Sequence, residues 1–196
     1  LEEDNVKKTI DGVRLLDPLD LPATNGVLHV LEAPLSPRKN VWQLIEENQT
    51  AKKHNSFLKN LGKKVFDPSI ATQTGVNPVT GRPVYDTLSG LVWRNAFTDH
   101  VADLLNEDSV FTAFLLTDQV YNMQFDRYRP YFNAGLNQAK TDSLTNWSIC
   151  KDLVFKGYLS TDELNKTLIS RFGVKVPVSS ADITETYKGS NGILYV

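Results

Sequence analysis

The sequence contains little cysteine, no marked excess of charge of either sign and no long apolar run. Cys150 is the single cysteine among 196 residues, so the chain can form no internal disulfide and no cysteine-based zinc site. This count mildly favours a bacterial or intracellular source. The 21 basic and 23 acidic residues leave a net charge of −2, which gives no broad attraction for a phosphate backbone or an anionic bilayer. We therefore expect no nucleic-acid partner.

Several signatures of membrane proteins and of enzymes are also missing. No apolar run approaches the roughly 20 residues that span a bilayer. The chain begins at Leu1 without a charged-then-apolar leader, so we expect that any signal or lipoprotein leader has been removed and that only a lipid anchor outside this chain reaches a membrane. No Gly-rich phosphate loop, His-Glu-x-x-His helix or Gly-x-Ser-x-Gly elbow occurs. We therefore expect no enzymatic activity, no cofactor and no metal.

Helical and strand patterns alternate along the chain. Asn40 is typical of a helix N-cap, and a later helix starting at Thr117 or Asp118 carries aromatic residues on one face. The prolines at 34 and 37 interrupt a strand pattern and indicate a boundary near residue 38. We expect helices from residue 40, over 54–61 with Gly62 at C′, from 117, and around 144–156 and 161–172, strands at 9–15, 27–31, 110–116, 174–178 and 193–196, and a hairpin turning at 78–81 within a long excursion over 66–87.

One short segment occurs twice. Residues 25–30 read Asn-Gly-Val-Leu-His-Val, and residues 191–196 read Asn-Gly-Ile-Leu-Tyr-Val. An acidic-aliphatic pair precedes each copy, Asp20-Leu21 in the first and Asp182-Ile183 in the second. An Asn-Gly pair suits a tight turn that needs positive φ, and the alternating residues after it suit a strand with one buried face. The repeat therefore indicates two related strand segments at the two ends of the chain.

The run over residues 16–37 closely resembles the C-terminal signature of fasciclin-like (FAS1) domains. In that family an Asp-Ile pair leads into Ala-Thr-Asn-Gly-Val-Ile-His-Val-Ile-Asp and a short tail ending in Leu-Pro. Residues 109–114, followed by Thr117-Asp118, look like the family's earlier block, in which Thr-Val-Phe-Ala-Pro precedes a threonine-capped helix, and residues 156–160 resemble the segment before its later strands. This chain departs from the pattern at Ala113-Phe114, at Tyr195 in place of histidine, and in the length of residues 66–90.

The resemblance implies an α+β fold, a wedge-shaped β-sandwich flanked by several α-helices. Residues 39–196 would form one such domain, with its last strand truncated because the tail that follows Val30 has no counterpart after Val196. Residues 1–38 would be the C-terminal strands of a preceding copy, or strands added to the main domain. The motif residues that the resemblance makes structural are Asn25, Gly26, His29, Thr117, Asp118, Asn191 and Gly192.

The resemblance further implies a non-enzymatic adhesion or ligand-binding module outside the cell. We expect a bacterial cell-envelope protein, as an outer-membrane or periplasmic lipoprotein with tandem domains. Its partners would be a cell-surface or matrix protein, a glycan, or a neighbouring domain of the same family. Asp182-Ile183 and Asp20-Leu21 lie where animal relatives carry an integrin-contact motif, although in each pair the acid could instead cap a turn and the aliphatic residue plug the core.

Other residues support alternative functions. A carbohydrate- or nutrient-capture component would use exposed aromatic residues such as Tyr85 or Trp93 on the excursion. A hydrolase would use His100 and Asp99 as an acid–base pair. The aromatic stripe over residues 121–132 suits core packing or a sugar-stacking surface, and the surroundings of Cys150 favour a buried inert thiol.

Overall fold

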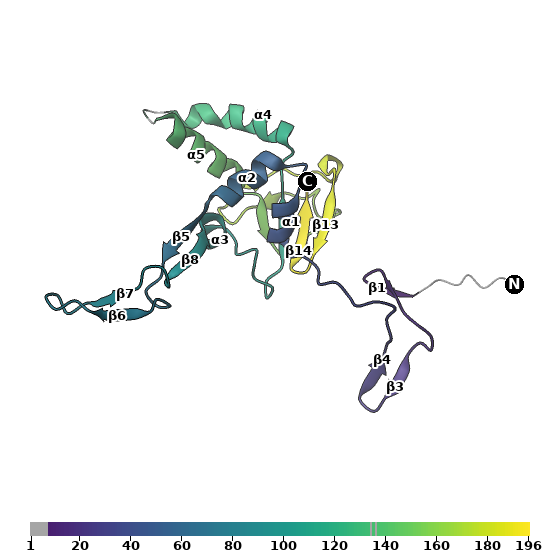
Figure 1. The fold of residues 1–196 in the computed structure, drawn as a ribbon. Coiled ribbons are helices and arrows are strands. Elements are labelled where there is room, and N and C mark those ends of the chain that lie inside the picture. The colour runs from purple at the N-terminus through teal and green to yellow at the C-terminus, as the bar shows by residue number, and fades with distance from the viewer. Residues whose placement is uncertain (1–7, 134, 136) are drawn as a thin grey trace. The chain divides into compact units, whose positions relative to one another are not determined.

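The chain forms two compact units. The computed structural model describes residues 8–133, 135 and 137–196. Unit 1 comprises Leu1–Arg38 and unit 2 comprises Lys39–Val196. Helices and strands both occur, which confirms the expected α+β class. Figure 1 labels helices and strands of both units.

The described residues of unit 1, 8–38, form two short antiparallel hairpins. β1 (Thr9–Ile10) pairs with β2 (Val13–Arg14), and β3 (Leu21–Ala23) pairs with β4 (Gly26–Leu28). Both strand predictions for this part of the chain are confirmed. Positive φ occurs at Asp11 and Gly12, as the first turn requires. The second hairpin has no positive φ at Asn25 or Gly26, so that expectation is wrong: Thr24-Asn25 closes the loop without it.

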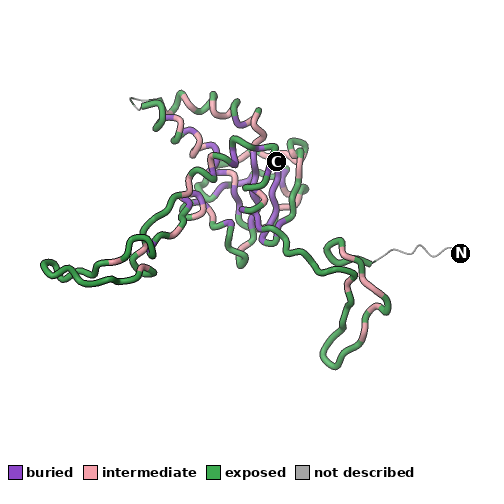
Figure 2. The backbone as a smooth tube through the Cα atoms, in the orientation of Figure 1, coloured by how far each residue is buried: buried purple, intermediate pink, exposed green. Residues whose placement is uncertain are grey.

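The centre of unit 2 is a four-stranded sheet in the order β10-β9-β14-β13. Its strands are β9 (Phe111–Phe114), β10 (Val154–Lys156), β13 (Thr186–Gly189) and β14 (Gly192–Tyr195), and β14 runs parallel to β9 while the other pairs are antiparallel. Every residue of β9 and β14 is buried. Figure 2 shows this buried centre in purple. Burial of both faces fits the sequences of these strands, which are apolar except for Thr112, whose hydroxyl is hydrogen-bonded.

Successive side chains of β9 and β14 point to opposite faces of the sheet, so the core has one cluster on each face. Ala113 and Leu194 point into a large cluster with the helices, whereas Phe114 and Ile193 point into a smaller cluster on the other face. The helices are α1 (Val41–Glu47), α2 (Lys52–Asn60), α3 (Ala96–His100), α4 (Asp118–Tyr128) and α5 (Gln138–Cys150), with the 3-10 turns η1 (Arg129–Phe132) and η2 (Ser180–Asp182). α1 packs against β13 and β14, and α4 packs against α2 and α5.

Side-chain caps set where several helices begin. Asn40 caps α1 in a capping box with Gln43, as the sequence predicts, and Thr117 caps α4. Asn137 caps α5, so this helix begins well before residue 144, and it ends at Cys150 because the following residues join the sheet as β10. On the aromatic stripe, Tyr121 is buried and Tyr128 is exposed, so only the start of the stripe packs into the core.

The helix expected over residues 161–172 is absent. The expected start exists, since the Glu163 carboxylate accepts hydrogen bonds from the backbone and side chain of Ser160. The chain then makes only turns and forms the hairpin of β11 (Leu168–Ile169) and β12 (Lys175–Val176), with Gly173 at positive φ. Burial of Leu164 and Leu168 against the smaller core cluster outweighs the local capping signal.

Residues 62–95 form a two-part β-arm, called the arm below (Figure 1). β5 (Gly62–Phe66) pairs with β8 (Leu91–Asn95) next to the core, and β6 (Gln73–Val76) pairs with β7 (Pro83–Tyr85) farther out. The predicted hairpin turn at residues 78–81 is confirmed. Gly62 follows the C-cap of α2, but it begins β5 without positive φ, contrary to its expected role as a C′ glycine.

Candidate ligand-binding site

A cleft of about 420 Å³ lies in unit 2 where the arm meets the core, and we call it the Trp93 cleft. It is lined by residues from α1, β8, α3 and the loop after α3: Trp42, Trp93, Arg94, Asn95, Thr98, Asp99, Asp103 and Leu105. Two larger hollows, of about 830 Å³ and 550 Å³, have no exposed aromatic side chain in their lining. The Trp93 cleft therefore stands apart by combining an exposed indole with charged groups.

Trp93 is held as a flat aromatic platform. Its indole packs over the backbone of Gly62, so closely that a Cβ atom on Gly62 would lie 2.3 Å from its Cζ2 atom. The residue is nevertheless 65% exposed. One part of the indole is thus supported by β5, and the remainder is open to a ligand. An exposed indole can stack on the C–H face of a sugar ring or against another planar group.

The charged groups around the indole are mostly acidic. The Arg94 guanidinium lies 3.9 Å from a carboxylate oxygen of Asp99 and 3.9 Å from one of Asp67. The carboxylate of Asp103 also lines the cleft and accepts a hydrogen bond from the backbone of Leu105. Hydrogen bonds from the side chain and backbone of Ser69, and the nearby Arg94 charge, hold the pKa of Asp67 below its usual value. The cleft therefore favours neutral or cationic ligands over anionic ones.

The junction between the arm and α3 is fixed by a buried amide. Asn95 accepts a hydrogen bond from the backbone N–H of Phe97 at 2.8 Å and donates one to the Leu58 carbonyl at 2.8 Å. The backbone carbonyl of Asn95 accepts a hydrogen bond from the hydroxyl of Thr98. Because α2, β8 and α3 are tied together at this point, the cleft is built before a ligand arrives, which lowers the entropy cost of binding.

Each of the two residue pairs that the sequence points to has only one member in the cleft. Trp93 lines the cleft, whereas Tyr85 lies on β7 with its ring 6.1 Å from that of Phe66 and does not line it. Asp99 lines the cleft, but His100 does not. Trp42 and Arg94 were not expected, since nothing in the sequence brings α1 and β8 together.

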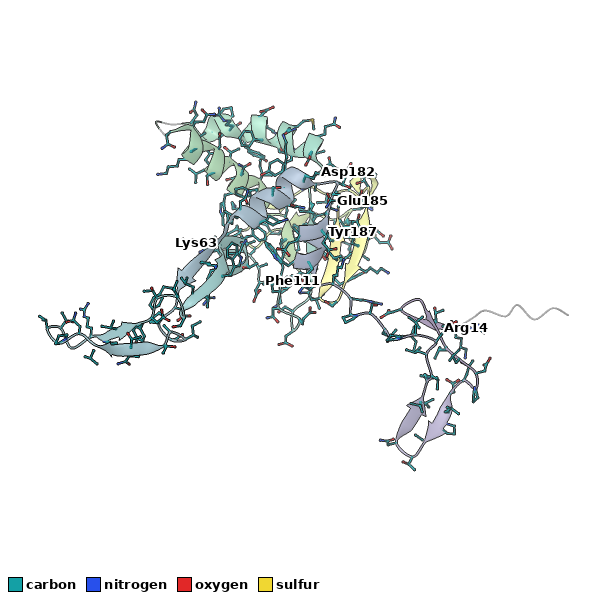
Figure 3. All side chains as sticks on the ribbon, in the orientation of Figure 1. Arg14, Lys63, Phe111, Asp182, Glu185 and Tyr187 are labelled. Carbon is teal, nitrogen blue, oxygen red and sulfur yellow. The ribbon has the colours of Figure 1, made fainter. Side chains whose placement is uncertain are left out.

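The acidic-aliphatic pairs lie elsewhere. Asp182 is exposed at the end of η2 and lines the 550 Å³ hollow with Lys166 and Lys175, and in Figure 3 it lies on the opposite side of unit 2 from Lys63 of the arm. Ile183 packs, partly buried, against the smaller core cluster. In unit 1, Asp20 lies 3.4 Å from the Nδ1 atom of His29, and Leu21 begins β3. No Asp-aliphatic pair contributes to the Trp93 cleft.

Three motif residues of unit 2, Asn191, Thr117 and Asp118, make structural contacts. Asn191 accepts a hydrogen bond from the Val41 N–H and donates to the carbonyls of Leu104 and Asn106. Thr117 caps α4, and Asp118 accepts a hydrogen bond from the Lys53 backbone.

Cys150 is buried, as expected. Burial raises the pKa of its thiol, and the Tyr121 hydroxyl lies 3.9 Å from its sulfur. A neutral, enclosed thiol is a weak nucleophile, so the structure gives Cys150 a packing role.

Within residues 8–133, 135 and 137–196, no three histidine, cysteine or acidic side chains gather as a metal site requires. In the same part of the chain no helix has the length and apolar character needed to cross a membrane. Comparisons with protein-family models, curated proteins and solved structures found no match to this chain.

Proposed function

We propose that this chain is a non-enzymatic binding module of the fasciclin type that acts outside the cell, on a bacterial cell envelope. The fasciclin-like block at residues 109–114 coincides with β9, and the threonine after it caps α4. Structural layers cover both faces of the central sheet, with helices over one and the β11–β12 hairpin over the other, as a wedge-shaped sandwich flanked by helices requires. These features support the fasciclin resemblance.

The ligand that we propose for the Trp93 cleft is a glycan. The single observation that carries this proposal is the indole of Trp93, seated on Gly62 and 65% exposed beside the carboxylates of Asp99 and Asp103. Sugars present apolar C–H faces and hydroxyl groups together, and the cleft offers an aromatic platform and acceptor oxygens together. Its volume of about 420 Å³ is within the range of small-molecule sites.

The charge of the cleft selects among glycans. Asp99 and Asp103 carry two negative charges against one positive charge on Arg94. A carboxylated sugar would meet repulsion, while a neutral sugar would not and an amino sugar would gain an ion pair. We therefore expect neutral sugars and amino sugars to bind better than uronic acids.

A glycan screen with matched aromatic variants tests this function. The 196-residue chain should bind a subset of neutral or amino-sugar oligosaccharides, and Trp93→Ala should weaken that binding about tenfold or more. Tyr85→Ala, which removes an arm aromatic that does not line the cleft, should leave the affinity unchanged. Circular dichroism checks that both variants fold. Failure of every glycan to bind, or a loss in Tyr85→Ala with none in Trp93→Ala, would contradict the proposal.

A further inference from the structure

The β3–β4 hairpin of unit 1 and the β13–β14 hairpin of unit 2 have the same local structure. In the first, Thr24-Asn25 forms the loop between the paired residues Ala23 and Gly26. In the second, Ser190-Asn191 forms the loop between Gly189 and Gly192. The sequence repeat is therefore also a repeat of hairpin register, with asparagine at the second loop position and glycine first in the returning strand.

The returning strands of the two hairpins, β4 and β14, differ in burial. In unit 2 the apolar residues after the glycine are covered, and Ile193, Leu194 and Val196 are 2%, 0% and 5% exposed. Their counterparts in unit 1 are open to solvent, with Val27, Leu28 and Val30 exposed by 58%, 59% and 42%. Figure 2 shows the β3–β4 hairpin in green and pink and the strand β14 in purple. A cluster of exposed aliphatic residues on a strand is typical of a surface that another element covers.

The Asn-Gly pair of unit 2 makes close contacts that the Asn-Gly pair of unit 1 does not make with the described residues. All the hydrogen-bonding groups of the Asn191 side chain are used, and a Cβ atom on Gly192 would lie 1.9 Å from the Phe111 carbonyl oxygen of β9. Asn25, by contrast, has no side-chain hydrogen bond to a described residue, and a Cβ atom on Gly26 would meet nothing within 4 Å. Asn25 and Gly26 are therefore suited to a close neighbour that the described residues 8–38 of unit 1 do not supply.

The backbone edge of β4 also lacks the neighbour that β14 has. In unit 2 the Phe111 N–H donates to the Asn191 carbonyl at 3.0 Å, and the Leu115 N–H donates to the Tyr195 carbonyl at 2.8 Å. The corresponding carbonyls of Asn25 and His29 receive no backbone hydrogen bond from the described residues. These two carbonyls point to the edge at which a parallel strand would donate hydrogen bonds, as β9 does to β14.

We propose that the β3–β4 hairpin is the closing hairpin of a second domain with the fold of unit 2, encoded upstream in the same polypeptide. That domain would supply a parallel strand equivalent to β9 and a helix equivalent to α1. Another molecule of this chain does not offer the strand, because its β9 is already paired with β10 on one edge and β14 on the other. The inference is independent of the glycan site, since unit 1 contributes no residue to the Trp93 cleft.

Cysteine labelling measures the cover over this hairpin directly. Because Cys150 is buried, Val27→Cys introduces one reactive thiol, and Val79→Cys, at a position 91% exposed on the arm, serves as the matched control. Maleimide should label both variants rapidly in the 196-residue chain. In the longer polypeptide that includes the upstream segment encoded by the gene, labelling of Val27→Cys should fall at least tenfold, while that of Val79→Cys should not change.

Three results would overturn the inference: equal labelling of Val27→Cys in both proteins, protection that grows with concentration in the 196-residue chain alone, or the absence of an upstream domain from the gene. A second variant keeps the test independent of the introduced thiol. Gly26→Ala should lower the melting temperature of the upstream domain in the longer polypeptide, where its methyl group would clash with the docked strand, and leave the 196-residue chain unchanged. No change in either protein would also count against the inference.

Discussion

At the scale of single residues, the two Asn-Gly pairs show how one short motif depends on its surroundings. Gly192 has a φ of +148° and lies against the backbone of β9, where neither strand can move away from an added methyl group. Gly26 has open space around it. The sequence predicts the hairpins correctly at both places, but it attributes the glycines to turn geometry, whereas Gly192 is required by the close approach of Phe111.

This difference predicts unequal effects of the same substitution. Gly192→Ala should destabilise the chain by about 3 kcal/mol or more, because its Cβ would overlap a backbone carbonyl. Gly26→Ala should change the free energy of unfolding by less than about 0.5 kcal/mol. Urea denaturation of the two variants of the 196-residue chain measures both values. Similar losses in the two variants would show that the close approach at Gly192 does not exist.

His54 makes stability depend on pH. It is 1% exposed, its Nδ1 atom accepts a hydrogen bond from the Leu116 N–H at 3.0 Å, and its ring lies 5.5 Å from that of Tyr121. Burial lowers the pKa of His54 from 6.5 to about 3. Between these values the unfolded chain binds a proton that the folded chain does not, so stability should fall as the pH drops below 6.5.

We expect His54 to change the free energy of unfolding by up to about 1.4 kcal/mol per pH unit over this range. Urea denaturation at pH 7.0, 6.0 and 5.0 measures it, and the neutral variant His54→Gln should lose that part of the slope whatever its stability at pH 7. Acidic residues whose pKa is lowered, such as Glu163 and Glu185, lose their contributions mainly below their ordinary value of 4.5. Equal slopes for the two proteins over this range would exclude His54 as the cause.

At the scale of elements, one part of the arm is predictable from local sequence and the part that forms the candidate site is not. Its outer hairpin is predictable from residues 77–82, where Asn, Pro and Gly set the turn, and Gly81 has a φ of +68°. The position of Trp93 over Gly62 is not predictable, because it depends on the pairing of β5 with β8 across a long segment. Likewise, residues 160–163 have the sequence of a helix start, but the chain forms the β11–β12 hairpin instead, because Leu164 and Leu168 are buried in the smaller core cluster.

Gly62→Ala tests whether the platform matters for binding. Its methyl group would push the Trp93 indole off β5, and because the indole is exposed it can move at little cost in stability. The variant should lose about tenfold in glycan affinity while its free energy of unfolding changes by less than about 1 kcal/mol. Gly75→Ala, on β6 with nothing near the added atom, is the matched control and should bind normally. Full affinity in Gly62→Ala, measured by calorimetry, would argue against a role for this packing.

At the scale of the whole molecule, periodicity predicts the core better than the site. The apolar run at 110–116 and the strand at 193–196 are confirmed as the two central strands of the sheet. The Trp93 cleft draws on α1, β8 and the loop after α3, which only the tertiary fold brings together. Trp42 illustrates this: it belongs to the large core cluster and is only 7% exposed, yet it lines the cleft.

The central claim is that a glycan binds beside Trp93, and the three tryptophans allow a direct measurement. Incorporation of 5-fluorotryptophan should give one fluorine NMR signal each for Trp42, Trp93 and Trp147, which Trp→Phe variants assign. Trp147 packs edge to face with Phe97 in the core, outside the cleft lining, and serves as the internal reference. Titration with a neutral or amino-sugar oligosaccharide should shift the Trp93 signal most, the Trp42 signal less and the Trp147 signal not at all. A Trp93 signal that stays unchanged at saturating glycan, or across a full glycan panel, would contradict the account.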